Sequence, residues 1–168
     1  MDIVDLPERI TGPSAWYGPD LAASGAWLVT LDSAQSAEVE GQAQAYLAKG
    51  GDIAQMTKAD FALPKSVPLI REAVDECLHR RGFVVLRGLP PHAENIPMAA
   101  AMFYGIGTHM GNARSQNGKG HLLGHVCDLG LSTTDANVRI YQTTERQNYH
   151  PDSCDIVGLM CLRGAKSG

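Results

Sequence analysis

The pattern of hydrophobic and polar positions predicts helices in the first two thirds of the chain. Apolar residues recur there at intervals of three and four, which is the period of one buried helix face. The first helix is expected from Asp32 or Ser33 to about Lys49, because a capping residue precedes it and Gly50-Gly51 follows it. Its inward face is expected to contain Val39, Ala43, Tyr46 and Leu47.

Two further helices are expected before residue 110. The second runs from Ser66, as its cap, to about Arg81, with Pro68 in its first turn and Gly82 at its end. Its apolar face consists of Leu69, Ile70, Ala73, Val74, Cys77 and Leu78. The third is rich in Ala and Met and is expected from residue 94 or 95 to residue 105 or 108.

Short apolar runs predict strands around and after these helices. Residues 27–31 form one candidate, and the continuous run 83–86 is typical of a strand buried on both faces, against which the second helix is expected to pack. Beyond Gly111 the chain alternates polar loops with three strand-like runs, at 121–128, 138–144 and 155–162. Helices followed by strands indicate an α+β fold with a β-rich core towards the C-terminus.

Composition and charge narrow the class of protein. The chain has 168 residues, of which 44% are hydrophobic, as in one globular domain or part of one. Its formal net charge is −4 and its basic residues are scattered, which argues against a nucleic-acid partner. The most apolar window, 96–106, is too short to cross a bilayer, and residues 1–5 are acidic without a signal-like apolar core. We therefore expect a cytoplasmic protein without a membrane partner.

The four cysteines do not form a recognisable metal or redox motif. Cys77, Cys127, Cys154 and Cys161 include no C-x-x-C pair. Reduced, half-buried thiols are the expected state in a cytoplasmic protein.

The tripeptide His150-Pro151-Asp152 is the main candidate for chemistry. It is the only His-x-Asp in the chain. Residues i and i+2 of an extended segment point to the same side, so the imidazole and the carboxylate could bind one metal ion together. With a second His, such a pair forms the 2-His-1-carboxylate triad of non-haem Fe(II) oxygenases. The pattern is short enough to occur by chance on a surface loop, so the surrounding motifs must decide whether it is a metal site.

Other polar clusters have simpler interpretations. The run 105–111 has the wrong glycine spacing for a dinucleotide loop and follows a helix instead of a strand. His121, His125 and Cys127 lack a second ligand pair, which favours structural roles over a zinc site. A hydrolase with zinc on His150 and Asp152 stays open as a minor alternative.

Several motifs taken together resemble one enzyme family. They are Asp60-Phe61-Ala62-Leu63-Pro64, Arg81-Gly82-Phe83-Val84-Val85-Leu86-Arg87-Gly88-Leu89-Pro90, Val138-Arg139-Ile140-Tyr141-Gln142-Thr143 and Tyr149-His150-Pro151-Asp152-Ser153-Cys154. The chain resembles the taurine dioxygenase-like (TauD/TfdA) family of Fe(II)/2-oxoglutarate-dependent oxygenases. The resemblance extends through nearly all of the chain and is strongest after Tyr149.

The resemblance implies a fold, a cofactor and a co-substrate. The fold would be a double-stranded β-helix, or jelly roll, with the N-terminal helices packed outside the sheet. The metal would be Fe(II), with His150 and Asp152 as two of its ligands, and 2-oxoglutarate would be consumed while a small organic substrate is oxidised. The third His ligand and the groups that bind 2-oxoglutarate would come from later strands, which this chain does not contain.

We therefore expect residues 1–168 to be the N-terminal part of one oxygenase domain. Within it, 1–25 would be an extended arm because of its three prolines, 26–110 the helix-rich part and 111–168 the start of the β core. Asn148 is expected on the strand face of His150, near the substrate or behind the ligands, and Gln116 and Asn117 at a pocket rim. The chain alone is expected to be inactive, and a non-catalytic jelly-roll fragment or binding protein is the alternative. Its oligomeric state stays open.

Overall fold

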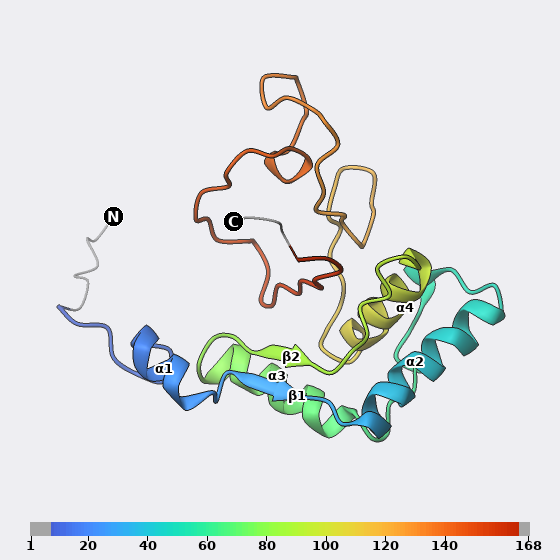
Figure 1. Cartoon of the computed structure of the whole chain (residues 1–168), viewed down its shortest axis with the longest axis horizontal. Coiled ribbons are helices and arrows are strands. Elements are labelled where there is room, and N and C mark those ends of the chain that lie inside the picture. The colour runs from blue at the N-terminus through green and yellow to red at the C-terminus, as the bar shows by residue number, and fades with distance from the viewer. Residues whose placement is uncertain (1–7, 165–168) are drawn as a thin grey trace, which may run out of the picture. The chain divides into compact units, whose positions relative to one another are not determined.

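The computed structural model describes residues 8–164, which form two compact units. The first unit comprises 8–112 and 158–164, and the second comprises 113–157. The first unit contains every α-helix and both strands of the described chain, as Figure 1 shows. Residues 1–7 of the expected arm and 165–168 of the expected β core lie outside the described residues.

Helix α2, Ser33–Ala48, begins and ends where the sequence predicts. Asp32 caps it by accepting the Gln35 N–H at 2.8 Å, and the Gln35 side chain accepts the Asp32 N–H at 3.0 Å. These two bonds form a complete capping box, which satisfies two groups that would otherwise lack partners. Val39 and Ala43 are fully buried, so the predicted inward face is confirmed.

Helix α4, Ile96–Gly107, supplies the largest share of the core. It begins close to the predicted start at residue 94 or 95, and Asn95 caps it by accepting the Met98 N–H at 3.2 Å. The helix packs against α2, and its residues Met98, Ala101 and Met102 are almost completely buried. Short 3₁₀ helix η1, Ile53–Gln55, and the buried side chains of Phe61 and Leu63 complete this core.

Helix α3, Val67–His79, follows Ser66, but the Ser66 hydroxyl does not cap it. The hydroxyl instead donates to the Glu38 carboxylate of α2 at 2.7 Å. The expected capping bond is therefore wrong, because the Ser66 backbone is already helical, at φ −91° and ψ −22°, and lacks the extended conformation in which an N-cap side chain reaches the helix amides. Of the predicted apolar face, Ile70 and Ala73 are buried, whereas Leu78 is 44% exposed.

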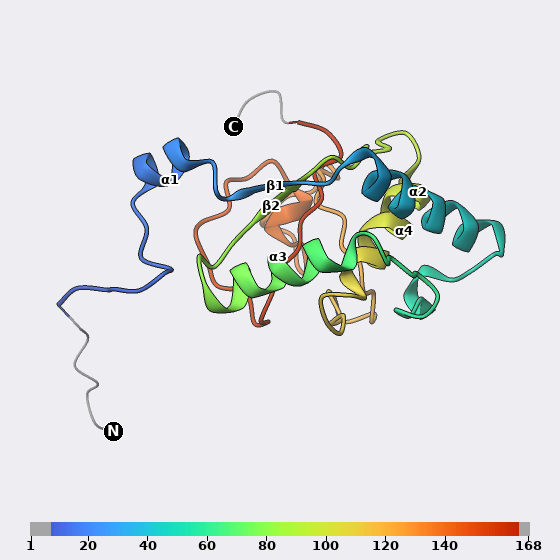
Figure 2. The same cartoon turned by 90° about the horizontal axis from the view of Figure 1, so that it is seen from below.

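The only sheet in residues 8–164 pairs β1, Leu28–Thr30, with β2, Val85–Arg87. The strands are parallel, with Leu28 opposite Val85, and run side by side in Figures 1 and 2. Leu86 packs against the core cluster that contains Ile70, so α3 and β2 contribute to one core. Burial on both faces is wrong, however, because Val85 is 40% exposed in this two-stranded sheet.

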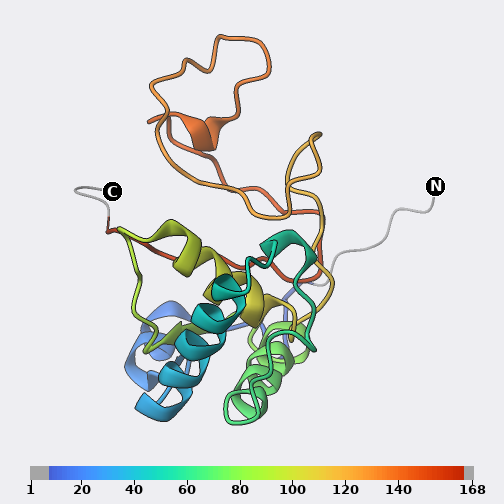
Figure 3. The same cartoon turned by 90° about the vertical axis from the view of Figure 1, so that its right-hand side faces the viewer.

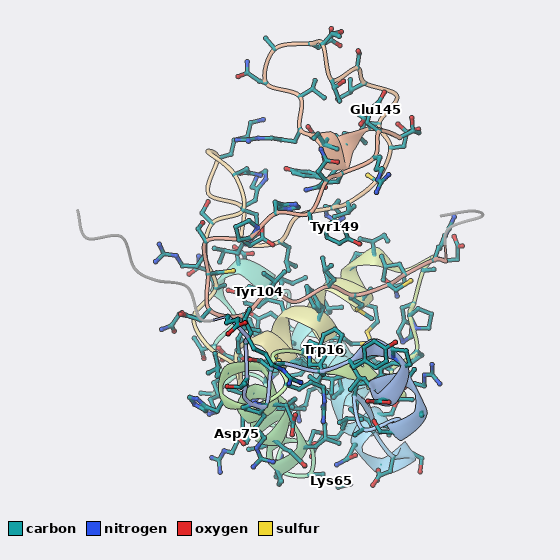
Figure 4. The ribbon with its side chains drawn as sticks, turned by 90° about the vertical axis from the view of Figure 1, so that its left-hand side faces the viewer. Trp16, Lys65, Asp75, Tyr104, Glu145 and Tyr149 are labelled. Carbon is teal, nitrogen blue, oxygen red and sulfur yellow. The ribbon has the colours of Figure 1, made fainter. Side chains whose placement is uncertain are left out.

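The expected extended arm contains a short helix, α1, Gly18–Ser24. Pro19 lies in its first turn, where a proline needs no N–H partner, and Gly25 ends it in the left-handed conformation at φ 62°. The arm is anchored at Trp16, labelled in Figure 4, whose indole N–H donates to the Arg81 carbonyl at 3.1 Å. Its ring meets Phe83 edge to face, with centroids 5.3 Å apart.

The second unit contains no strand among its described residues, which corrects the predicted start of a β core. Figure 3 shows this unit as loops with one helical turn, η2, Ile140–Gln142. The runs at 121–128, 138–144 and 155–162 have strand composition but no strand pairing. A strand needs neighbours that accept and donate its backbone bonds, and a single pair is marginal in water. The described fold is thus mixed helix and strand with a small sheet.

Residues 8–164 contain neither a membrane-spanning helix nor a disulfide. No helix there is long and apolar enough to cross a membrane. All four cysteines lie in this range, and none of them forms a disulfide. Cys77 is half-buried, whereas Cys127, Cys154 and Cys161 are exposed. The expectation of half-buried thiols therefore holds for one of the four.

Replacing Glu38 with Gln is expected to destabilise the first unit at neutral pH. The carboxylate accepts the N–H groups of Lys65 and Ser66, each at 2.9 Å, as well as the Ser66 hydroxyl. Burial works to raise the Glu38 pKa, but these hydrogen bonds and the Lys65 charge outweigh it and the pKa is lowered. A neutral amide has one acceptor oxygen and turns an NH₂ towards the remaining donors. We expect a loss of about 1–3 kcal/mol in urea unfolding.

The pH dependence of that loss follows from the lowered pKa. A carboxyl whose folded pKa lies below its unfolded value stabilises the fold above the unfolded value, and the contribution is lost as the pH falls through the folded value. The gap between wild type and Glu38→Gln should therefore shrink on acidification. Glu72→Gln, an exposed change on α3, is the control. A gap of constant size down to acid unfolding would contradict this role of the Glu38 charge.

Candidate functional site

His150 and Asp152 lie in a loop of the second unit, not at the end of a strand as predicted. The closeness expected of their side chains is nevertheless present, because His150 Nε2 is 3.7 Å from Asp152 Oδ1. Two atoms that each bond one first-row metal at about 2 Å are at most about 4 Å apart. Both side chains are about half exposed, at 48% and 52%. This pair can therefore reach one metal ion, and water has access to it.

The backbone beside His150 selects which ring nitrogen is free. The carbonyl of Asn148 lies 2.9 Å from Nδ1, and a carbonyl can only accept, so Nδ1 carries the proton. In a neutral imidazole with this tautomer Nε2 keeps its lone pair, and Nε2 lies 3.7 Å from Asp152 Oδ1. A bond from the second ring N–H to a backbone carbonyl is the usual way in which a metal-binding histidine is oriented.

A residue that the sequence reasoning missed also reaches His150. The side-chain nitrogen of Gln147 lies 3.0 Å from Nε2 and 3.5 Å from Nδ1. Gln147 is three residues before His150, and this separation brings side chains together in a turn but not in a strand. Because a strand was expected here, the sequence contained no signal that favoured Gln147.

The other predicted site residues make hydrogen bonds close to their own positions in the chain. Asn148 contacts the ring through its backbone carbonyl. The described bonds of Gln116 and Asn117 stay within residues 114–121: Gln116 donates to the Arg114 carbonyl at 2.9 Å, and Asn117 accepts the N–H of His121 at 3.3 Å. None of these bonds joins Gln116 or Asn117 to His150, so their place at a pocket rim stays a prediction.

Three other histidines form hydrogen bonds or ion pairs away from His150. His92 pairs with Glu40 of α2 at 2.6 Å, and His109 meets the Phe61 carbonyl at 2.7 Å through Nε2. His121 contacts Asn117 through Nδ1 at 3.0 Å. Within residues 8–164, no three His, Cys, Asp or Glu side chains gather closely enough to hold a metal ion. His150 and Asp152 thus fit two positions of a metal centre, and no third such ligand joins them there.

A histidine and a carboxylate this close together supply two of the three ligand types of a 2-His-1-carboxylate metal site. The sequence matches the family described as "Taurine catabolism dioxygenase TauD, TfdA family" over residues 47–168, and the chain belongs to this family. Its fold is the jelly roll, and its members are oxygenases of the Fe(II) and 2-oxoglutarate type.

Two relatives match almost the whole chain. FR-33289 synthase of Streptomyces rubellomurinus is 28% identical over 97% of this chain and 48% of its own length. Taurine hydroxylase-like protein SAT17 of Stachybotrys chartarum is 27% identical over 98% of this chain and 45% of its own length. The chain therefore spans about half the length of the relatives that it matches.

Proposed function

We propose that this chain is part of an Fe(II)- and 2-oxoglutarate-dependent oxygenase that oxidises a small organic molecule, with His150 and Asp152 as two metal ligands. The observation that carries the proposal is the 3.7 Å approach of Nε2 to Asp152 Oδ1 while Nδ1 is bonded to the Asn148 carbonyl. Family membership over residues 47–168 supports the reaction type. The substrate class of either relative is not carried over to this chain.

In this proposal the protein's own residues orient the two metal ligands, and the bound metal would carry out the chemistry. The Asn148 carbonyl keeps the proton on Nδ1, so that Nε2 presents its lone pair, and Asp152 contributes the negative charge. The bound iron with 2-oxoglutarate would supply the activation of O₂, which protein side chains cannot perform.

The rest of the site would come from residues outside this chain. We propose that a later segment of the family domain supplies the third His ligand and the 2-oxoglutarate contacts, since both relatives are about twice as long. The same segment would add strands to residues 113–162 and complete a jelly roll, which would give the exposed Val157 and Leu159 partners. A cytoplasmic location is part of the proposal.

Titration of the chain with Mn²⁺ tests the two ligands. Mn²⁺ prefers the same nitrogen and oxygen donors as Fe²⁺ but is stable in air. We expect His150→Ala and Asp152→Ala each to weaken binding at least about 10-fold, since even residues that only orient a ligand account for about 10–100-fold. His125→Ala and Asp135→Ala, exposed changes in the same unit, are the controls.

Equal affinity of wild type and His150→Ala for Mn²⁺ would reject this ligand assignment. Binding of Mn²⁺ by the wild type without any turnover in the completed enzyme would favour the alternative, a non-catalytic binding protein. That alternative rests on the half-exposed pair and on the lack of a third His, Cys, Asp or Glu beside it in residues 8–164.

A further inference from the structure

The environment of the His150 imidazole contains one contact that the proposed function does not use. The nitrogen of the Gln147 side chain is almost equally far from both ring nitrogens, at 3.0 Å from Nε2 and 3.5 Å from Nδ1. A donor along the Nε2 lone pair would lie in the ring plane and much farther from Nδ1, because that lone pair points away from Nδ1. A donor in the plane between the two nitrogens would collide with the carbon that joins them. The amide therefore lies over the face of the imidazole.

This placement leaves the in-plane lone pair of Nε2 free. An N–H group over an aromatic face is a weak attraction, but it restricts the tilt of the ring. The Asn148 carbonyl, at 2.9 Å from Nδ1, restricts its rotation and its tautomer. The two contacts thus restrict different motions of the same ring, and they come from the adjacent residues Gln147 and Asn148.

We propose that Gln147 is a positioning residue for His150: its amide covers the imidazole and, with the Asn148 carbonyl, holds the ring in the Nδ1–H form that turns Nε2 towards Asp152. This inference rests on the proposed function for its metal ion, but the orientation of the ring is a property of the metal-free chain. His150 is 48% exposed, so few other contacts restrain the ring. Removal of the amide is therefore expected to release it.

The neighbouring residues make this assignment specific to Gln147. Tyr149 is fully exposed, and its side chain, labelled in Figure 4, belongs to the same loop as that of Glu145. No hydrogen bond in the described residues joins either side chain to the His150 ring. Gln147 is thus the side chain through which this loop can hold the imidazole before metal arrives.

The first test reads the ring without any metal. The ¹⁵N chemical shifts of the His150 imidazole are measured by NMR in the 168-residue chain, at alkaline pH where histidine is neutral. We expect mainly the Nδ1–H tautomer in the wild type and a clear rise of the Nε2–H tautomer in Gln147→Ala, because a ring that is free to tilt loses the Nδ1–H bond to the Asn148 carbonyl. Gln44→Ala, an exposed change on α2, is the matched control and should leave the His150 shifts unchanged.

The second test reads the cation affinity of the same variants with Mn²⁺. Gln147→Ala should weaken binding about 10–100-fold, as expected for a residue that orients a ligand. Gln147→Asn, which keeps the amide on a shorter stem, should recover part of the affinity if the amide group matters and not merely the bulk.

The two tests separate this inference from the proposed function. An Nε2–H tautomer in the wild type, or shifts and affinity unaffected by Gln147→Ala, would overturn the role of Gln147. An affinity that survives His150→Ala would overturn the metal ligand, and the tautomer measurement would still decide whether Gln147 orients the ring.

Discussion

The 168-residue chain by itself is expected to form no succinate from 2-oxoglutarate above the background of free iron. His150 and Asp152 offer two donor atoms, and no third His, Cys, Asp or Glu lies beside them in residues 8–164. Two protein ligands do not determine which positions of the iron stay open for 2-oxoglutarate and O₂. The assay contains the purified chain, Fe(II), ascorbate, 2-oxoglutarate and O₂.

A longer polypeptide, in which the second half of the family domain follows Gly168, is expected to form succinate under the same conditions. His150→Ala in that longer polypeptide should lower the rate by more than the 10–100-fold typical of a residue that only orients a ligand. His125→Ala, in the same unit, is the control. Succinate formed by the short chain and abolished by His150→Ala would show that these residues already contain a complete site.

Gly105→Ala is expected to destabilise the first unit by about 1–3 kcal/mol, the usual cost of an added group in a tight core. A Cβ atom at Gly105 would lie 2.5 Å from the Cε1, Cε2 and Cζ atoms of Phe61. Phe61 is fully buried and cannot turn away without moving its neighbours. Gly107→Ala is the matched control on the same helix, because nothing lies within 4 Å of its added Cβ.

Urea unfolding of both variants measures this effect. Gly107→Ala should be neutral or stabilising, since Ala exceeds Gly in helix propensity by up to about 1 kcal/mol. Phe61→Leu removes part of the ring and should reduce the additional cost of Gly105→Ala when the two are combined. Equal stabilities of the two alanine variants would contradict the close contact between Gly105 and Phe61.

The contact between Gly105 and Phe61 also explains a misleading motif. Gly105-Ile106-Gly107 loosely resembles a nucleotide-binding loop, and its glycine spacing and its position after a predicted helix argued against that role. The structure supplies the physical reason for the first glycine: it lets the ring of Phe61 lie directly against α4. Phe61 and Gly105 are far apart in sequence, so only the folded chain could reveal this packing.

The sequence alone predicted the helices well because their determinants are local. Asp32 and Asn95 cap α2 and α4, and the apolar spacing of Val39 and Ala43 is a property of consecutive residues. It failed at Ser66, whose hydroxyl bonds Glu38 from another helix, and at α1, where a proline in the first turn was interpreted as a helix breaker. It also failed over residues 113–162, because strand formation depends on partners distant in sequence.

The candidate site also has a part that the sequence predicts and a part that only the structure shows. His150 and Asp152 could be selected from the sequence, since their residue types and separation are local, and the family follows from motifs along the chain. Only the folded structure showed that Gln147 lies over the imidazole and that the Asn148 carbonyl meets Nδ1. These contacts depend on the loop turning where a strand was expected. Residue spacing determines which side chains are available, and the path of the backbone decides which of them meet.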